Sequence, residues 1–293
     1  MQLFGQILVN GILLGGLYGL MGLGMGLVWG VLKIVNLAHG ALIMMGGYAL
    51  YFLYTKAGID PFLGLPLAML ILFAIGYLLQ VLLLNLIVRS AQLNTLLLTF
   101  GLDVVFVYMA QLLFTADFRT INPPYAGKNV SLLGVTVPYA QLGAFGVAVL
   151  LAALLYLVLD RTRTGRAIRA TAQNLVAARL YGVNPKRIYA VTFGIGAALA
   201  GAAGSLVAVL YSFSPVVGDG FTMKAFVVVV LGGLGSIRGA IVAGIVLGVV
   251  ENVVSGLLVP GYRDAVSFVL LVLVLVLRPR GIFGNRYLAD ARI

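Results

Sequence analysis

The chain contains no cysteine, a single histidine and few charged residues. The absence of cysteine excludes a disulfide framework, and one histidine leaves too few ligands for a His/Cys zinc, haem or iron–sulfur site. Only 9% of the 293 residues are charged, against about 25% in an average soluble domain. Such a chain cannot cover a soluble surface of this size with polar groups. An ordinary cytosolic enzyme, a disordered protein and a disulfide-rich secreted domain are therefore excluded.

Motifs of nucleotide-dependent and hydrolytic enzymes are also missing. The sequence has no His-Glu-x-x-His and no Gly-x-Ser-x-Gly motif, and Asn129 follows Gly127-Lys128 where a phosphate-binding loop needs Ser or Thr. We therefore expect no catalytic residue, no metal, no cofactor and no ATP site in this chain. A membrane-embedded enzyme is an alternative that no visible set of residues supports.

Apolar residues are in excess, at 62% of the chain, and the mean hydropathy is +1.12. Long apolar runs of this kind are typical of membrane-spanning helices. We expect an all-α, polytopic transmembrane bundle that forms a single domain over residues 1–293. The predicted segments are 5–31, 37–55, 63–88, 93–114, 139–159, 188–211, 225–231, 240–259 and 262–277. Because 225–231 is short and glycine-rich sequence follows it, one of these eight or nine segments is expected to be broken or re-entrant.

The net charge of +11 is concentrated in two short stretches. Residues 160–187 and 278–293 hold eleven cations and two anions, which gives 11 − 2 = +9. Basic stretches beside apolar spans are typically cytoplasmic, so we expect both on the inside and no nucleic-acid partner. With nine segments the C-terminus is then cytoplasmic and the N-terminus outside. Residues 115–138 and 212–220 are predicted to be outer loops.

Polar side chains inside the spans are candidates for a translocation pathway, because ionisable groups at membrane depth are costly. Asp103 lies near the centre of its predicted span, and Thr99 lies one turn before it on the same helix face. Asp103 either bonds to donors inside the bundle or lines the pathway. Asn36 and His39 fall near the inner membrane boundary, where a lone histidine is more often a hydrogen-bonding group of the bundle.

Further candidates lie near other predicted helix ends. Glu251, in the outer half of its span, is interpreted equally well as a packing group or as part of an outer gate. Lys224 and Arg263 can simply extend their charged ends to the membrane interface. The glycine-rich break with Gly233 and Gly235 is predicted to lie at the pathway, because free backbone groups inside a membrane need protein or a water-filled cavity around them.

Small residues recur every four positions in several spans. Such rows let helix backbones approach closely in lipid, so we expect them at helix–helix contacts. Two examples are Gly11/Gly15/Gly19 and Ala240/Gly244/Gly248.

The basic segment at about 160–187 predicts a short amphipathic helix over 166–181, parallel to the membrane on its inner side. Gly182 can end this helix with a positive φ. The helix is too polar to span the membrane and is suited to dock a cytoplasmic partner, through small residues that permit close approach and arginines that pair with acidic groups. The residues expected at this contact are Arg166, Arg169, Ala177, Ala178 and Gly182. The alternative is a basic loop that only fixes the topology.

Three blocks of the sequence resemble the permease subunits of branched-chain amino acid ABC importers, of the LivH kind. The blocks are Asn36–Gly40, Gly165–Asn184 and Leu231–Ala240. The second block also matches the Ala-Ala-x-x-x-Gly core of the motif by which importer permeases couple to their ATPases. Val176 stands where that motif usually has Glu, and Arg238 stands where many relatives have Pro.

The resemblance implies a permease of the ABC importer type in a bacterial or archaeal cytoplasmic membrane, surrounded by lipid. Its implied partners are two cytoplasmic ATP-binding subunits, a second homologous permease or a copy of itself, and a periplasmic or lipid-anchored substrate-binding protein. The implied cargo is branched-chain, hydrophobic amino acids, with other amino acids, urea or short amides as alternatives. A stand-alone channel or secondary transporter is a further alternative, although the sequence lacks a charge-relay chain and carries the docking-like segment.

Overall fold

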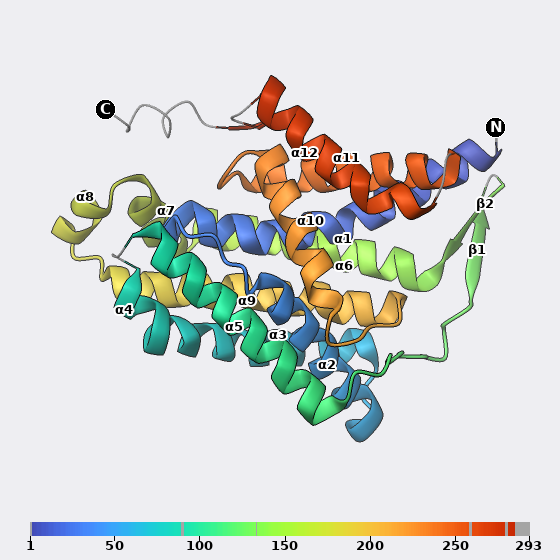
Figure 1. The fold of residues 1–293 in the computed structure, drawn as a ribbon, viewed down its shortest axis with the longest axis horizontal. Helices are drawn as coiled ribbons and strands as arrows, with labels where there is room; N and C mark the ends of the chain where they lie inside the picture. The colour runs from blue at the N-terminus through green and yellow to red at the C-terminus, as the bar shows by residue number, and fades with distance from the viewer. Residues whose placement is uncertain (1, 89–90, 133, 258–259, 279–280, 285–293) are drawn as a thin grey trace.

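A computed structural model describes residues 2–88, 91–132, 134–257, 260–278 and 281–284. The chain folds as a bundle of helices with one small hairpin (Figure 1). The helices are α1 (Gln2–Leu32), α2 (His39–Ala57), α3 (Pro61–Leu79), a π-helical turn η1 (Gln80–Leu84), α4 (Asn85–Ile87), α5 (Gln92–Phe114), α6 (Tyr139–Arg161), α7 (Arg163–Gln173), α8 (Leu175–Leu180), α9 (Pro185–Leu210), α10 (Val217–Gly232), α11 (Ile237–Leu257), a 3-10 turn η2 (Pro260–Tyr262) and α12 (Arg263–Leu277). The strands are β1 (Asn129–Leu132) and β2 (Val135–Pro138), which pair antiparallel.

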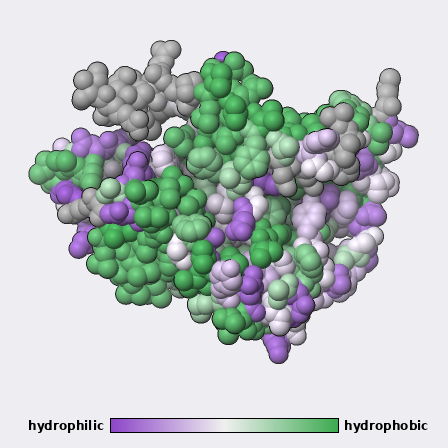
Figure 2. Space-filling model, in the orientation of Figure 1, coloured by the Kyte–Doolittle hydropathy of each residue, from purple (hydrophilic) through white to green (hydrophobic). Residues whose placement is uncertain are grey.

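Each predicted span corresponds to a helix, which confirms the all-α polytopic fold. Six helices of the described chain are long and apolar enough to cross a membrane, namely α1, the continuous α3–η1–α4, α5, α6, α9 and α11. The shorter α2, α10 and α12 account for the other predicted segments. Figure 2 shows broad apolar patches over the outer helices, which suits a surface in contact with lipid.

One predicted loop is shorter than expected, and another contains a small hairpin. The 212–220 loop is shorter than expected, because α10 begins at Val217 and the short run at 225–231 is the second half of a 16-residue helix. The 115–138 segment is not all loop either, since β1 and β2 form a hairpin in it. The hairpin is fixed to the start of α1, where the Gln6 side chain donates to the Thr136 carbonyl at 2.7 Å and accepts from the Thr136 N–H at 2.8 Å.

The centre of the bundle is α1, which packs along α9 and α11. The small-residue rows allow this approach: a Cβ on Gly15 would lie 2.5 Å from the Cα of Ile245, and a Cβ on Gly248 would lie 2.5 Å from the Cα of Gly15. The contact is therefore one of backbone against backbone, as predicted from the rows. It leaves no room for a side chain at either glycine.

The bundle has two distinct ends. The "basic end" comprises the C-terminal ends of α1 and α6, helices α7 and α8, and the 233–236 turn between α10 and α11. The "hairpin end" comprises β1, β2 and the start of α1, and lies on the opposite side of the molecule (Figure 1). The predicted cytoplasmic segment 160–187 lies at the basic end. Of the second basic stretch only 278 and 281–284 are described, so Arg280, Arg286 and Arg292 lie outside the described residues. The side chain of Arg263, at the start of α12, also lies outside them.

Two helices begin inside the bundle instead of at an end. At the start of α2, His39 Nε2 lies 3.0 Å from the carbonyl oxygen of Met21, which is in the middle of α1. The start of α10 packs beside it, where a Cβ on Gly218 would lie 2.6 Å from the carbonyl oxygen of Gly40. The N-termini of α2 and α10 therefore meet within the bundle.

Candidate functional site

The basic segment forms two short helices rather than the single helix predicted over 166–181. Thr162 caps α7, its hydroxyl accepting from the N–H of Gly165 at 2.9 Å. The helix ends at Asn174, whose own side chain accepts from the N–H of Ala177 at 3.0 Å and so caps α8. An asparagine in extended conformation (φ −151°) serves as the N-cap of a new helix, which explains the break.

Gly182 ends α8 as predicted. Its φ is +80°, a left-handed conformation that side chains with a Cβ rarely adopt. The turn is closed by the N–H of Val183, which donates to the carbonyl of Ala178 at 3.0 Å. The chain then enters α9 at Pro185, with Asn184 as its N-cap.

The surface of α8 differs from the prediction. Ala178 is only 3% exposed, so it packs within the chain, and Ala177 is half-buried. The groups presented outward are apolar: Val176 is 67% exposed, Leu180 84% and Tyr181 89%. The sequence could have indicated this apolar surface, because these three large apolar residues lie in or beside a short helix outside every predicted span.

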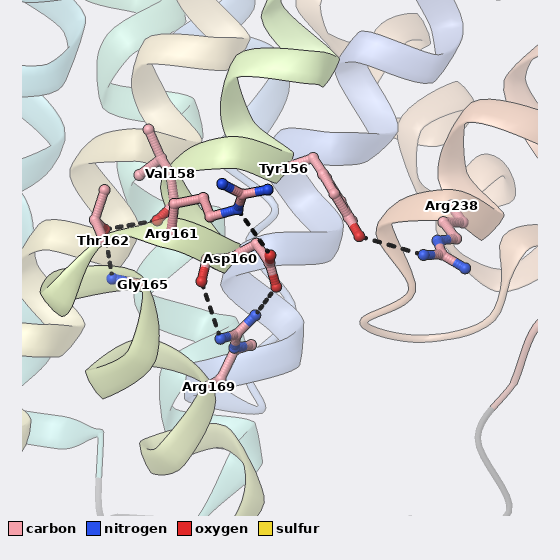
Figure 3. Close-up of polar contacts among 8 residues, drawn as sticks. All are labelled: Tyr156, Val158, Asp160, Arg161, Thr162, Gly165, Arg169 and Arg238. Atoms are coloured by element: carbon pink, nitrogen blue, oxygen red, sulfur yellow. Dashed lines mark hydrogen bonds and ion pairs between the residues drawn. The ribbon is translucent and has the colours of Figure 1, made fainter.

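The two arginines predicted to contact a partner have different surroundings. Arg166 is exposed. Arg169 Nη1 lies 2.8 Å from Oδ1 of Asp160, the penultimate residue of α6, and so holds α7 against α6. Arg161 lies 3.7 Å from the other oxygen of the same carboxylate (Figure 3).

A cavity of about 670 Å³ opens at the basic end. Its walls come from the last turns of α1 and α6, from α7, and from the 235–238 turn. Arg238 bridges part of it, donating to the Tyr156 hydroxyl at 3.3 Å with its guanidinium 5.7 Å from the ring centre (Figure 3). Lys33 lines it from the end of α1, in a left-handed conformation with φ +59°.

Four of the predicted pathway residues come together around the start of α2. The Thr99 hydroxyl of α5 lies 3.3 Å from the N–H of Leu37 and 3.2 Å from the carbonyl of Val35, on either side of Asn36. His39 is fully buried at the first position of α2. The Asp103 carboxylate of α5 lies near the backbone of Ala41 in the first turn of α2 and within electrostatic range of Asp219 in the first turn of α10.

Glu251 lies elsewhere, in a buried cluster that joins four helices. The Lys224 ammonium of α10 lies 2.9 Å from Oε1 of Glu251 in α11, and the Tyr18 hydroxyl of α1 donates to Oε2 at 2.7 Å. Ser267 of α12 also donates to this carboxylate. The expectation that Lys224 extends to the interface is therefore wrong: its side chain is 10% exposed and turns inward to a carboxylate that is completely buried.

Gly233 and Gly235 lie at the basic end, apart from the other predicted pathway residues. Both have positive φ, +98° and +82°. The turn they form packs against the end of α1, where a Cβ on Gly235 would lie 3.1 Å from the Cα of Gly30. The segment 281–284 closes over the end of α10, as the N–H of Ile282 donates to the Leu231 carbonyl at 2.8 Å.

Comparison with known proteins decides the family. Residues 7–275 match the model described as branched-chain amino acid transport system, permease component. The chain belongs to this family. It is 35% identical to the permease BraD of Pseudomonas aeruginosa, over 96% of this chain and 95% of that one, and 33% identical to LivH of Escherichia coli, over 96% of both.

A second type of permease from the same system also matches. LivM of Escherichia coli is 30% identical over 91% of this chain and 67% of its own length. Among solved structures, PsaBC from Streptococcus pneumoniae, in complex with Fab, has a TM-score of 0.50 at 11% identity and covers 94% of both chains. That likeness concerns the fold alone.

Proposed function

We propose that this chain is the permease subunit of an ATP-driven importer that moves branched-chain amino acids across the cytoplasmic membrane. The observation that carries the proposal is the end-to-end match to permeases named for high-affinity branched-chain amino acid transport. The chain is then half of a translocation path and hydrolyses no ATP itself. Its partners are two ATP-binding subunits, a second permease of the same family or a second copy, and a periplasmic or lipid-anchored binding protein.

The ATP-binding subunit is proposed to dock on the tip of α8. Val176, Leu180 and Tyr181 are largely exposed there, although they lie outside the apolar spans. Exposed apolar side chains with basic neighbours suit a cleft that is apolar inside and acidic at its rim. Arg166 and Arg179 supply the basic neighbours, whereas Arg169 is engaged with Asp160.

Co-purification of the ATP-binding subunits tests this docking surface. Leu180→Asp and Tyr181→Asp place charges in the proposed contact and are expected to lose both co-purification and the ATPase stimulation caused by loaded binding protein. Phe118→Asp is the matched control, since Phe118 is 75% exposed in the loop before the hairpin. Normal ATPase stimulation in both α8 variants would contradict the docking proposal and indicate that the basic segment only fixes the membrane topology.

The pathway is proposed to pass the meeting point of the α2 and α10 N-termini. Both side-chain amide atoms of Asn36 are buried there without a hydrogen-bond partner in the described part of the chain. Asp103 and Asp219 lie within electrostatic range of each other, and like charges in a lipid-facing position are costly, so this face is assigned to the second permease or to water. Helix N-termini at such a point suit the carboxylate of an amino acid, because the positive end of each helix dipole faces it.

Transport by the full set of subunits in proteoliposomes tests both the pathway and the cargo. We expect saturable uptake of leucine, isoleucine and valine and no uptake of urea or acetamide. Asp103→Asn and Asn36→Leu are expected to lower uptake while assembly and basal ATPase activity persist. Uptake of amides alone would overturn the cargo, and unchanged uptake in both variants would overturn the pathway.

The turn at Gly233 and Gly235 remains a candidate for the inner part of the pathway. Leucine at either position needs a strained positive φ, and at Gly233 its Cβ would lie 2.7 Å from the backbone nitrogen of Gly284. Both variants are expected to block uptake although the protein still reaches the membrane. Normal uptake in Gly233→Leu and Gly235→Leu would remove the turn from the pathway.

The orientation is proposed to place the basic end in the cytoplasm and the hairpin end outside. The chain has no cysteine, so single cysteines give a clean test. A cysteine at Ser131 in the hairpin should react with an impermeant thiol reagent from outside, and one at Arg166 should not. The reverse labelling pattern would invert the topology.

A further inference from the structure

The cavity at the basic end carries more positive charge than the described chain neutralises. Its wall contains three cations, Lys33, Arg169 and Arg238, and one anion, Asp160. Asp160 pairs with Arg169. Neither Lys33 nor Arg238 has a carboxylate within ion-pairing distance in the part of the chain that the structure describes.

Lys33 is held at the cavity in an unusual way. It is a non-glycine residue with φ +59°, a conformation that costs free energy for a residue with a Cβ. Lys33 is exposed on one side, and partial desolvation by the cavity wall lowers the pKa of its ammonium. A strained, partly desolvated cation at a cavity wall gains from an anion placed beside it.

The cavity lies at the ends of helices long and apolar enough to cross a membrane. Lys33 directly follows α1, Arg238 is at the start of α11, and Tyr156 is in the last two turns of α6, which spans 23 residues. An exposed tyrosine near the end of a span is typical of the membrane interface. Phosphates of lipid headgroups are found at this level, beside basic side chains.

Part of the cavity wall is apolar. Leu27, Val31 and Leu159 line it, beside Gly26 and Gly30 of α1. On the adjoining surface of α6, Leu150, Leu154 and Leu157 recur at helical spacing and are each about half exposed. A ligand with both an anionic head and an apolar body matches this combination, whereas a free anion makes no use of the apolar part of the wall or of the α6 surface.

We propose that this cavity binds the phosphate of an anionic membrane lipid, with Lys33 and Arg238 as its ligands and the acyl chains on α6. Arg169 is already paired with Asp160, so it holds α7 against α6 at the cavity wall and contributes no unpaired charge. Phosphatidylglycerol meets the requirement, because it has one phosphate with a net negative charge. Phosphatidylcholine does not, since its headgroup is neutral overall. The proposal does not depend on the transported substrate.

The test is a titration of the full-length permease in neutral detergent, with bound lipid counted by native mass spectrometry. The probes are dioctanoyl phosphatidylglycerol, dioctanoyl phosphatidylcholine and inorganic phosphate. We expect saturable phosphatidylglycerol binding that is at least tenfold tighter than that of phosphatidylcholine, with no comparable binding of inorganic phosphate. Phosphate that competes as strongly as the lipid would show a free-anion site and overturn the proposal.

The variants are chosen to preserve the fold. Lys33→Gly removes the ammonium and also the strain at positive φ, and Arg238→Gln keeps a donor for Tyr156. Together they should weaken phosphatidylglycerol binding at least tenfold, and Lys33→Arg with Arg238→Lys should retain it. The control, Lys186→Gln with Arg187→Gln, removes two exposed cations of the same end that do not line the cavity and should change binding less than twofold.

The control also separates a lipid site from a general electrostatic effect. Equal losses in the cavity and control variants would mean that total charge at the basic end attracts the lipid, and the proposal fails. The proposal also fails if the cavity variant binds lipid normally but no longer co-purifies with the ATP-binding subunits, because the cavity is then a protein contact.

Discussion

Two ion pairs with nearly the same N–O distance occur in the described part of the chain, one inside the bundle and one at the basic end. Lys224 and Glu251 are 2.9 Å apart, and Arg169 and Asp160 are 2.8 Å apart. The first pair is almost completely buried, whereas the side chains of the second are 45% and 44% exposed. Burial, and not distance, therefore decides what each pair contributes: the first is costly to break, and the second is screened by water.

The same contrast holds for the regions around the two pairs. In the bundle, Tyr18 and Ser267 satisfy the remaining capacity of the Glu251 carboxylate, so that four helices share one polar cluster. At the basic end, Arg161 only approaches the Asp160 carboxylate at 3.7 Å from an exposed position. The polar groups of the buried cluster hold the helices together, because lipid offers them no other hydrogen-bond partner. The charged groups of the basic end face solvent and remain accessible to other molecules.

Loss of Glu251 should have the largest effect. Glu251→Leu leaves the Lys224 ammonium buried without its carboxylate, which costs about 3–5 kcal/mol for a buried pair. Denaturant unfolding of the purified permease, followed by its single tryptophan, measures this loss. In the double variant Lys224→Met/Glu251→Leu most of the stability should return, because neither charge remains. A double variant as unstable as the single one would mean that the charges themselves are not the cause.

Overpacking at the α1–α11 contact should have the next largest effect. Gly15→Leu forces a side chain against the backbone of α11, which costs about 1–3 kcal/mol or more when neither helix can move. Gly146→Leu is the matched control, because nothing lies within 4 Å of a Cβ on that α6 glycine. The unfolding experiment should show a loss for Gly15→Leu alone. Equal losses would indicate that the cost is not one of contact.

The features that could be predicted from sequence are those that local pattern determines. Hydropathy located the spans because a membrane requires long apolar helices. The glycine rows indicated which helix faces pack closely, although not that α1 and α11 are partners. The end of α8 at Gly182 followed from its need for positive φ. In each case neighbouring residues, or residues one turn apart, carry the whole signal.

The features that could not be predicted depend on residues far apart in the sequence. Lys224 and Glu251 are 27 residues apart and Tyr18 is more than 200 residues away, so no periodicity links them. For the same reason Asp103 could be placed at mid-span but not beside the start of α2. The break between α7 and α8 at Asn174 was missed for another reason. Ala and Arg favour helix on both sides of Asn174, and only its extended backbone and capping hydrogen bond show that one helix ends and another begins there.

Strain at Gly182 should have an intermediate effect, confined to the basic end. Gly182→Val places a β-branched residue at φ +80°, at a cost of about 1–2 kcal/mol, and shifts α8 rather than unfolding the bundle. Gly182→Asn is the control, since asparagine tolerates this conformation. We expect Val to abolish ATPase stimulation by loaded binding protein, and Asn to retain it. Stimulation lost in both would implicate the small size of glycine instead of its φ.

The exposed pair should have the smallest effect and completes the comparison with Lys224 and Glu251. A double-mutant cycle with Asp160→Asn and Arg169→Gln is expected to give a coupling of about 0.2–1 kcal/mol in unfolding at low salt. At about 1 M salt the coupling should vanish, because charges that face water are screened there. The buried pair should keep its coupling under the same conditions, since solvent ions do not reach a carboxylate with no exposed surface. A coupling at Asp160 that exceeds 2 kcal/mol or resists salt would show that the basic end is as closed to water as the bundle interior, and would contradict its role as an accessible docking region.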